Sequence, residues 1–452
     1  MKAVIFWLEA IDSWIWQSLF IILLATGLFL TYRLRGLQFR HLIYALKLVF
    51  TYRDHQGEGD ISHFQALMTA LAATIGIGNI AGIATAIAMG GLGSLFWLWM
   101  TALIGMATKY SEAILAIKYR IVDARGEMAG GPMYYIRDGL GWKWLAIFFA
   151  FFGSIAALLT GNFVQSHSIA SAVLTTLDIN VWITGAILAI ATGLVLIGGI
   201  RTIGRLTALL VPTMALLYIF GSIWILVVRF ADMGGAMKLI FSTAFTGQAL
   251  SGGFAGSTVM MAIQMGVARG VFSNESGLGS APIAAAAAKT DLPGRQALIS
   301  MTGAFLSTIV CTFTGLAIAV TGVLGKTSSD GIMLNGIPLT MAAFDCTIPF
   351  GRWIVVIGSI LFGYSTIFGW AYYGEKCCEY LFGIRSIFSY RVLFSIFVFL
   401  GVGIPIEVVW SIADIANAFM ALPNLIGIVA LSNVVVLQTQ IFLKQVKKEK
   451  MF

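Results

Sequence analysis

The sequence predicts an all-α, polytopic membrane protein, and three observations support this fold class. Of the 452 residues, 59% are hydrophobic and 11% are charged, whereas a soluble protein carries about a quarter charged residues. The mean hydropathy of the chain is +0.92. Apolar stretches as long as one bilayer crossing, about 20 residues, recur along the whole sequence. These properties exclude an ordinary soluble domain.

Eleven stretches are long and apolar enough to cross a bilayer, so we expect eleven transmembrane helices. Several of them exceed the minimum length of a span, and we expect these helices to be tilted or kinked. The stretches lie near residues 14–32, 64–89, 94–118, 143–175, 181–199, 202–229, 250–270, 296–324, 352–381, 388–405 and 410–443.

The basic residues are distributed unequally between the loops on the two sides of the predicted membrane. With the N-terminus outside, the cytoplasmic loops receive 22 of the 28 Lys and Arg residues. Membrane proteins carry such an excess of positive charge on the cytoplasmic side. We therefore expect an external N-terminus and a cytoplasmic C-terminus. The net charge of +8 then reflects topology, and no nucleic-acid partner is needed to explain it.

Residues 1–62 are expected to form an extra N-terminal helix followed by an amphipathic cytoplasmic segment. Within this region, His41–Tyr52 is basic and amphipathic, which is typical of a helix on the inner membrane surface. The start of the chain lacks the basic region and the cleavage site of a signal peptide. The four cysteines have neither metal-ligand nor disulfide-framework spacing, so we expect free thiols.

The apolar stretch Ala66–Gly91 is interrupted in its middle by Thr74–Asn79, which reads TIGIGN. Glycine costs a helix about 1 kcal/mol per residue relative to alanine. A helix broken at bilayer depth exposes backbone groups that must find partners inside the protein or in a water-filled cavity. Secondary transporters build substrate and ion sites from such broken helices. We interpret Thr74–Asn79 as the centre of a substrate and ion site.

Two other patterns overlap this stretch. Gly78 and Gly82 form a GxxxG pattern, whose small residues let membrane helices pack closely, and the spacing alone does not separate packing from a break. Gly76, Gly78 and Ala81 match a dinucleotide-binding fingerprint, but that motif needs a preceding strand and an acidic residue about 20 positions later. The flanks are apolar and the next acidic residue is Glu112, so a dinucleotide site is excluded.

The spans after the first divide into two equal halves. Five lie within residues 63–229 and five within 249–443, and a basic tail follows at 444–452. We interpret residues 1–452 as a single transporter domain. Because each half has an odd number of spans, the halves have opposite orientations, which is the condition for an inverted repeat with its site between them.

The first span of the second half, Gly252–Gly270, should then mirror the broken helix. It reads GGFAGSTVMMAIQMGVARG, and Gln264 and Gly266 interrupt its apolar run. We expect the second break here, where freed oxygens would bind the amino group of a substrate. Gln165 is predicted to line the same pocket, because polar amides within spans face the interior of a helix bundle.

Four stretches carry a resemblance to a known family, and with the eleven-span layout they cover essentially the whole chain. They are Ala72–Gly82 (AATIGIGNIAG), Gly130–Arg137 (GGPMYYIR), Arg269–Pro282 (RGVFSNESGLGSAP) and Gly363–Glu375 (GYSTIFGWAYYGE). The chain resembles the alanine/glycine:cation symporters, also called sodium:alanine symporters, of bacteria and archaea. The resemblance implies the leucine-transporter fold, with a five-plus-five inverted repeat, discontinuous helices at the midplane and one extra N-terminal helix.

The same resemblance implies a function and a location. It implies sodium-coupled uptake of a small neutral amino acid, alanine or glycine, by alternating access across the plasma (inner) membrane of a prokaryotic cell. Sodium is then the coupling ion and the lipid bilayer is the surrounding medium. No cofactor, no other metal, no obligate protein partner and no catalytic residue is expected.

The resemblance implies that the unwound segment holds the substrate. Backbone amides at Gly76 and Gly78 would bind the substrate carboxylate, and Asn79 would contact substrate or ion. Trp370 lies four residues after Thr366, on the same helical face, where it would exclude larger side chains. The full set of predicted substrate-binding residues is Gly76, Gly78, Asn79, Gln165, Gln264, Gly266 and Trp370.

The resemblance also implies a sodium site between two helices. Ser365 and Thr366 would supply hydroxyls, Ala72 and Ile75 would supply backbone carbonyls, and Thr74 would lie beside the ion. Hard cations take oxygen ligands of this kind. The alternative is that the Ser and Thr hydroxyls bond back to their own helix.

Several other functions were compatible with fewer features of the sequence. Proton coupling in the same fold would use an acidic residue or a histidine at depth, for which His167 and Glu112 are the candidates. A membrane enzyme would need a nucleophile–base pair or a metal cluster, and a channel would lack a closed pocket. A non-transporting amino-acid sensor is a further alternative. Lys109 and Glu112, three residues apart, are expected to pair with each other.

Overall fold

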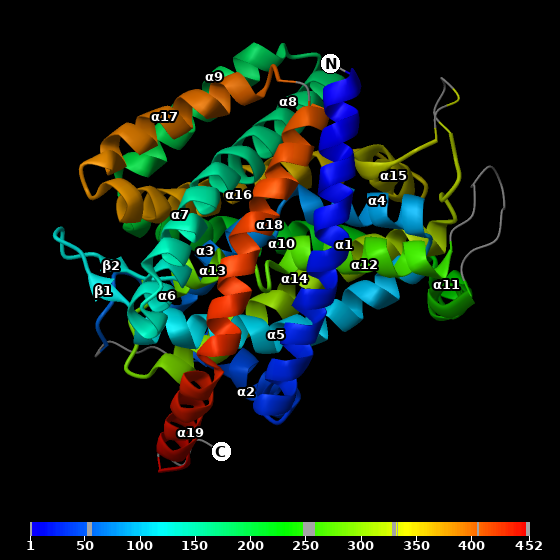
Figure 1. The fold of residues 1–452 in the computed structure, drawn as a ribbon. Coiled ribbons are helices and arrows are strands. Elements are labelled where there is room, and N and C mark those ends of the chain that lie inside the picture. Colours follow the sequence, from blue (N-terminus) through cyan, green and yellow to red (C-terminus); the bar gives the residue numbers. More distant parts are fainter. Residues whose placement is uncertain are drawn as a thin grey trace.

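The computed structural model describes residues 2–51, 57–246, 258–327, 331, 333–404 and 406–448. Most of these residues are helical, and a two-stranded antiparallel hairpin is the one sheet in this described part (Figure 1). The expectation of an all-α chain is therefore confirmed.

The elements fall into two series along the chain. The first series is α1 (Lys2–Arg33), α2 (Leu37–Thr51), α3 (His63–Thr74), the 3₁₀ turn η1 (Ile77–Asn79), α4 (Ala81–Gly90), α5 (Gly93–Lys118), β1 (Ile121–Val122), β2 (Met128–Ala129), α6 (Pro132–Leu140), α7 (Lys143–Leu158), the π turn η2 (Leu159–Phe163), α8 (Val164–Leu177), α9 (Val181–Ile197) and α10 (Gly199–Val228). The second series is α11 (Phe230–Thr246), α12 (Val259–Asn274), α13 (Ala281–Ala286), α14 (Pro293–Thr321), α15 (Gly336–Asp345), α16 (Arg352–Phe382), α17 (Ser386–Gly401), α18 (Ile406–Ala430) and α19 (Ser432–Lys448).

Six described stretches of helix are long and apolar enough to cross a membrane, and the bent pair formed by α3 and η1–α4 would add a seventh span. The six are α1, α7–α8, α10, α14, α16 and α18, and the apolar helices α9 and α17 are shorter. The chain is therefore a multi-pass membrane protein. The count of eleven spans and the inverted repeat stay predictions.

A local sequence signal explains where α3 begins. The side chain of Ser62 accepts a hydrogen bond from the Gln65 amide at 3.2 Å, and the Ser62 amide donates to the Gln65 side-chain oxygen at 3.0 Å. This reciprocal cap satisfies two amide donors at the start of α3.

The predicted surface segment at residues 41–52 lies within α2 up to Thr51, and Tyr52 falls outside the described residues.

One predicted span needs correction, and the start of another lies outside the described residues. The last span was expected at residues 410–443, but α18 ends at Ala430 and α19 starts at Ser432. The chain after Leu431 is much more polar, with lysines near its end, so α19 forms a separate amphipathic helix. The predicted span 250–270 begins outside the described residues, which resume at Thr258.

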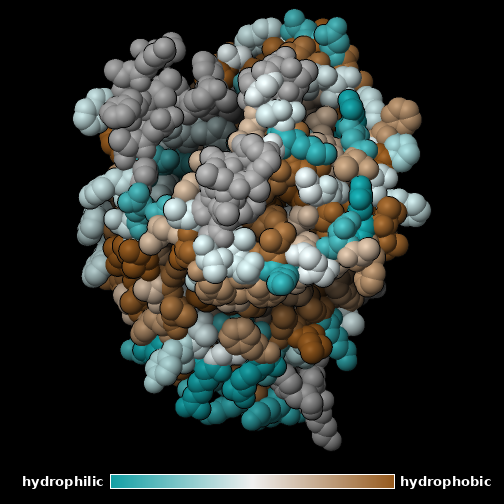
Figure 2. Space-filling view, turned by 90° about the vertical axis from the view of Figure 1, so that its right-hand side faces the viewer, coloured by the Kyte–Doolittle hydropathy of each residue, from teal (hydrophilic) through white to brown (hydrophobic). Residues whose placement is uncertain are grey.

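Segments that are distant in sequence lie side by side around the two broken spans. The helix α5 packs closely against α12 and α14, α16 packs against α7 and α3, and α1 lies along α18 (Figure 1). Figure 2 shows brown, hydrophobic side chains across the middle of the visible face and teal, hydrophilic ones at its lower end. This distribution suits a protein whose middle is surrounded by lipid.

Candidate functional site

The first break falls where the sequence predicts it. The helix α3 ends at Thr74, and the next helical segments run on at an angle of 65° to it. Gly76 donates its amide to the Asn79 side-chain oxygen at 3.2 Å, so one freed backbone group is satisfied within the loop. A β-carbon at Gly76 would approach the Thr366 hydroxyl to 2.6 Å, which explains the need for glycine there.

Asn79 is fully buried and holds the break against α14. Its side-chain nitrogen donates to the backbone oxygen of Ser307 at 3.2 Å and to the Ser307 hydroxyl at 2.9 Å. The same nitrogen lies 3.3 Å from the sulfur of Cys311. The structure therefore places the Asn79 side chain in contact with α14. Asn79 is not among the residues that line the cavity between the broken spans, so its predicted contact with substrate lacks geometric support.

Two backbone N–H groups at this break are available to a ligand. Within the part of the chain that the structure describes, the amides of Ile77 and Gly78 donate no hydrogen bond. A β-carbon built at Gly78 would meet no atom within 4 Å, because this residue borders open space. Unpaired amides at the start of a helical turn favour an anion such as a carboxylate.

The second break lies further along the chain than the sequence suggested. We expected it at Gln264 and Gly266, but α12 continues unbroken from Val259 to Asn274. Gly266 instead allows close packing, because a β-carbon there would overlap the backbone oxygen of Ser94 on α5. The prediction of a break at this position is wrong, since a glycine in a membrane helix can serve packing as well as unwinding.

The chain unwinds between Asn274 and Ala281. Glu275, Gly277 and Gly279 have positive φ angles of 51°, 94° and 81°. A right-handed helix has negative φ angles throughout, so the helix ends here. The segment reads ESGLGS and is followed by Pro282 in the first turn of α13. The alternating glycines and this proline are the signal that could have located the break.

Charged and polar side chains satisfy the backbone of the second break. Lys109 donates from its ammonium to the backbone oxygen of Asn274 at 2.6 Å. Glu112 accepts from the Gly277 amide at 3.0 Å and from the Asn424 side chain at 2.7 Å, and Asn424 also donates to the Gly277 oxygen at 2.8 Å. The expectation that Lys109 and Glu112 pair with each other is wrong in the described structure. Both bind the unwound backbone.

A central cavity of about 50 Å³ lies between the two breaks. Five elements contribute to its wall: both broken spans, α7–α8, α16 and α18. Its lining residues are Ala73, Thr74, Gly76, Gly78, Thr160, Gln165, Arg269, Phe272, Ser273, Glu275, Leu278, Thr366, Trp370, Trp410 and Asn417. Six predicted site residues thus meet here: Thr74, Gly76, Gly78, Gln165, Thr366 and Trp370.

A π turn in the α7–α8 helix shapes one side of this cavity. It frees the Thr160 carbonyl, which accepts from the Gln165 side chain at 3.1 Å, while Asn417 donates to the Thr160 hydroxyl at 2.8 Å. Such turns are frequent at functional sites. A β-carbon at Gly161 would overlap the Trp370 side chain. The π turn and its glycine therefore let Trp370 form a wall of the cavity, a role for η2 that the sequence did not reveal.

The predicted ion ligands lie at the contact between α16 and the end of α3. The Thr366 hydroxyl lies 3.0 Å from the Ala72 backbone oxygen, and the Ser365 hydroxyl lies 3.5 Å from it. Both hydroxyls also lie within 3.0 Å of the Phe362 oxygen of their own helix. Thr74 bonds back to the Ala70 oxygen at 3.0 Å. Ala72, Ser365 and Thr366, three of the predicted sodium ligands, are therefore adjacent. The Thr74 hydroxyl bonds to its own helix, which is the alternative to ion binding.

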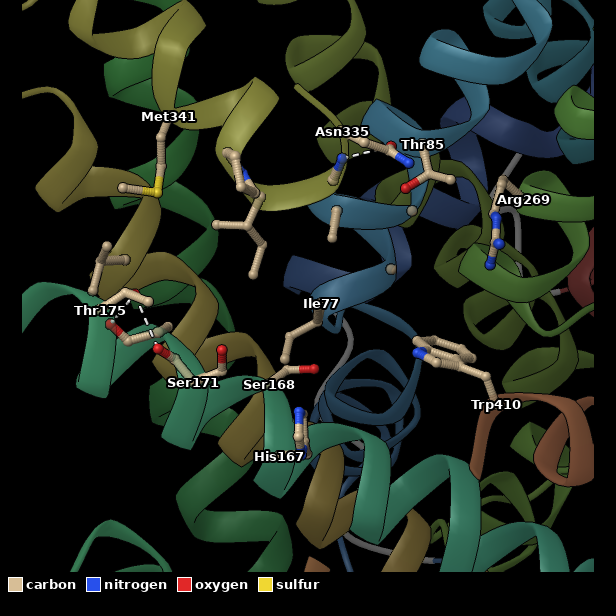
Figure 3. Close-up of a pocket in the computed structure, with 18 of the residues that line it drawn as sticks. Ile77, Thr85, His167, Ser168, Ser171, Thr175, Arg269, Asn335, Met341 and Trp410 are labelled. Atoms are coloured by element: carbon tan, nitrogen blue, oxygen red, sulfur yellow. Dashed lines mark hydrogen bonds between the residues drawn. The ribbon is translucent and has the colours of Figure 1, made fainter. Parts of the chain in front are cut away.

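A larger cavity of about 540 Å³ adjoins the central one, and we call it the vestibule. Figure 3 shows His167 and Ser168 of α8 on one side of it and Arg269 and Trp410 on another. Gly78, Arg269 and Trp410 line both cavities. The guanidinium of Arg269 lies 5.7 Å from the Phe272 ring centre and 6.0 Å from that of Trp410. These side chains form the boundary between vestibule and central cavity.

Two residues of interest lie outside the central cavity. Gln264 lines a separate cavity of about 210 Å³ together with Asp12 of α1 and Asp414 of α18. His167 lines the vestibule. The expected substrate contact of Gln264 therefore lacks geometric support, as does that of Gly266, which packs on α5.

The β1–β2 hairpin lies near α3, α6 and α13 (Figure 1). Arg120, just before the hairpin, donates to the backbone oxygen of Glu58 at 2.7 Å. It also donates to those of Ala286 at 3.0 Å and Ala288 at 2.7 Å. Glu58 precedes α3, and the two alanines lie at the end of α13. One guanidinium thus ties together the ends of both spans.

The same hairpin is ion-paired to α16, and we call this cluster the inner latch. The buried ammonium of Lys376 lies 3.4 Å from Asp123 on the hairpin and 2.9 Å from Glu379 on its own helix. Arg125 pairs with Glu127 at 2.7 Å. Burial raises the pKa of Asp123, but the Glu127 amide and the Lys376 ammonium outweigh it and hold this pKa below its usual range. The Asp123 contribution to stability is therefore present at neutral pH and is lost only as the pH falls through that lowered pKa.

Two cavities between broken helices, closed at one end by an ion-paired hairpin, define the class as a secondary transporter of the leucine-transporter fold. The crystal structure of MhsT in complex with L-phenylalanine matches with a TM-score of 0.61 at 13% identity, covering 85% of this chain and 93% of that one. A manganese transporter of Eremococcus coleocola matches with a TM-score of 0.51 at 13% identity, covering 83% and 79%. At such low identity these matches show the fold alone.

The chain belongs to the sodium:alanine symporter family, whose sequence model matches residues 1–452. It is 53% identical to the sodium/alanine symporter AgcS of Methanococcus maripaludis over 441 residues, which cover 96% of each chain. It is 35% identical to the amino-acid carrier protein AlsT of Bacillus subtilis over 428 residues, covering 94% of this chain and 89% of that one. The protein is accordingly a transporter and not an enzyme.

Gly266 and Gly78 give a matched test, because the first glycine packs against a neighbouring helix and the second borders the cavity. Gly266→Ala should lower the free energy of unfolding by about 1–3 kcal/mol, because its methyl group would overlap α5. Gly78→Ala should change it by no more than about 0.5 kcal/mol, since a β-carbon there meets open space. Thermal unfolding of both purified variants in the same detergent measures the difference. Equal losses would contradict the assignment of Gly266 to packing.

Removal of the Lys109 ammonium should destabilise the second break. Lys109→Met leaves the Asn274 oxygen without its donor and leaves buried carboxylates uncompensated, which costs about 3–5 kcal/mol. Lys143→Met removes the same charge from an exposed position at the start of α7 and serves as the control. Thermal unfolding should separate the two variants clearly. Similar midpoints would show that Lys109 does not hold the break.

Proposed function

We propose that this protein takes up a small neutral amino acid, alanine or glycine, together with sodium, by alternating access. The observation that carries the proposal is the Thr366 hydroxyl, which lines the central cavity and lies 3.0 Å from the Ala72 oxygen at the first break. Substrate and ion would therefore bind on adjacent sides of the same unwound segment. The name of the relative AgcS, a sodium/alanine symporter, supports this assignment.

The cavity suits the carboxylate of a small amino acid. The unpaired amides of Ile77 and Gly78 would donate to that carboxylate, aided by the positive end of the following helical turn. Gly78 lets the substrate approach the backbone closely. Phe272 and Trp370 line the same cavity, and their rings would leave room for a side chain no larger than a methyl group.

Sodium would bind between α3 and α16. The hydroxyl oxygens of Ser365 and Thr366 and the Ala72 carbonyl oxygen converge there, and the Ile75 carbonyl is the further proposed ligand. Such a set of neutral oxygens suits a hard cation and needs no carboxylate. Because the ion would bridge the broken span and α16, its binding would favour one relative position of the two helices.

The two candidates for proton coupling, His167 and Glu112, lie in other parts of the structure than the central cavity. His167 lines the vestibule, and Glu112 accepts hydrogen bonds that hold the Gly277 backbone. Neither is among the residues that line the central cavity. Sodium coupling is therefore better supported than proton coupling through either of these two residues.

Alternating access would exchange the open and closed ends of the molecule. The vestibule reaches the central cavity from one end, whereas the hairpin and the inner latch close the other. The distribution of basic residues supports a cytoplasmic latch and an external vestibule. Movement of one positive charge through about 100 mV yields about 2.3 kcal/mol, and a tenfold sodium gradient adds about 1.4 kcal/mol. Together they would sustain roughly a 500-fold substrate gradient per ion.

Uptake of radiolabelled alanine into proteoliposomes tests the function and the ion site together. The wild type should accumulate alanine under an inward sodium gradient but not under a potassium gradient. Thr366→Ala should raise the half-saturating sodium concentration about tenfold, which corresponds to about 1.4 kcal/mol for one lost ligand. Thr366→Ser keeps the hydroxyl and is the matched control.

Two results would contradict this proposal. Accumulation driven by a pH gradient without sodium would favour proton coupling instead. A Thr366→Ala variant with an unchanged sodium dependence would remove the α16 hydroxyl from the ion site, even if the wild type transports alanine.

Trypsin cleavage after Arg125 tests the inner latch and its side of the membrane. Lys376→Met leaves Asp123 and Glu379 without their shared cation, so the hairpin should open more often. A loss of about 1.4 kcal/mol would speed cleavage about tenfold, and only in vesicles that expose the cytoplasmic face. Lys118→Met, at an exposed position at the end of α5, is the control. Equal cleavage in right-side-out vesicles would reverse the proposed orientation.

A further inference from the structure

Two charged residues, Arg269 and Glu275, are among the described residues that line the central cavity. Both come from the second broken span. Arg269 also lines the vestibule, whereas Glu275 does not. Glu275 therefore lies in the part of the cavity that is remote from the vestibule, and the cavity has one cationic and one anionic region.

The Glu275 carboxylate is held in a defined position. The residue is 2% exposed and has left-handed backbone angles at the end of α12, with its amide bonded to the Val271 oxygen at 2.8 Å. One carboxylate oxygen accepts from the Ser280 hydroxyl at 2.7 Å. Trp370 lines the same cavity as Glu275. The Ser280 hydroxyl, at the end of the unwound segment, therefore holds the carboxylate in place.

The Glu275 carboxylate is buried among polar groups. Lys109, Glu112 and Glu275 form a cluster around the second break in which no residue is more than 2% exposed. The Lys109 ammonium donates to the Asn274 backbone oxygen, and the Glu275 carboxylate accepts from the neutral Ser280 hydroxyl. An uncompensated charge away from water is strongly unfavourable. A proton, or a cation that enters the cavity, would balance it.

The ends of the broken helices reinforce this polarity. α3 ends at Thr74 and α12 ends at Asn274, and helix C-termini carry partial negative charge. The unpaired amides of Ile77 and Gly78 present the opposite polarity, and Gly78 adjoins the vestibule. An amino acid carries its ammonium and carboxylate on one carbon, so its zwitterion matches this arrangement in a single orientation.

We propose that Glu275 binds the α-ammonium group of the transported amino acid and thereby selects amino acids over other small carboxylates. This inference rests on the proposed function and deepens it. The carboxylate of the substrate then faces the Ile77 and Gly78 amides, with Arg269 on the vestibule side. Glu275 is a specificity-determining residue in this arrangement, distinct from the oxygen ligands proposed for sodium.

Alanine and lactate provide the test, because lactate has the same carbon skeleton and carboxylate but a hydroxyl in place of the ammonium. The concentrations of each that half-inhibit sodium-driven uptake of labelled alanine are measured in proteoliposomes. Glu275→Gln should weaken alanine at least tenfold while changing lactate less than twofold. Glu275→Asp keeps the charge and should restore part of the preference.

Glu112→Gln is the matched control, because it removes a carboxylate from the same cluster without touching the cavity wall. It should lower the thermal midpoint but keep the wild-type ratio of alanine to lactate. If uptake by Glu275→Gln is too weak to measure, sodium-dependent thermal stabilisation by each ligand gives the same ratio. An unchanged ratio in folded Glu275→Gln, or an equal loss for both ligands, would overturn the proposal and leave Glu275 as a structural residue of the second break. A wild type without sodium-driven alanine uptake would instead refute the proposed function.

Discussion

The structure depends on one constraint, namely that backbone groups freed by a broken helix at membrane depth must be satisfied inside the protein. At the first break, the Asn79 side chain accepts from the Gly76 amide and is itself anchored on α14. At the second, Lys109 and Glu112 of α5 bind a carbonyl and an amide of the unwound backbone. Charged residues within α5 are thus required by the break in a neighbouring span.

The groups that remain unpaired define the site. Ile77 and Gly78 keep free amides, while the carbonyl of Ala72 faces the hydroxyls of α16. The same unwinding therefore offers donors to an anion and acceptors to a cation within one short segment. These backbone groups lie at the centre of the protein together with the charged side chains of Arg269 and Glu275.

The prediction of the two breaks from sequence succeeded once and failed once, for a physical reason. At Gly76 and Gly78 the glycines coincide with unwinding, as expected. At Gly266 the glycine permits close contact with Ser94 on α5, and the real break follows at Glu275, Gly277 and Gly279. Small residues serve both roles in membrane helices, so composition alone does not separate them. The neighbouring helix decides which role applies.

The sequence by itself determined that the chain is a helical membrane protein, where its first span breaks, and which family it resembles. Hydropathy, glycine placement and long motifs are local properties, so they can be read without coordinates. Only the tertiary structure decided that Asn79 contacts α14, that Lys109 and Glu112 bind the second break, and that Glu275 lines the central cavity. These contacts join residues up to 232 positions apart, and such partners are chosen by the packing of helices, which no single stretch of sequence encodes.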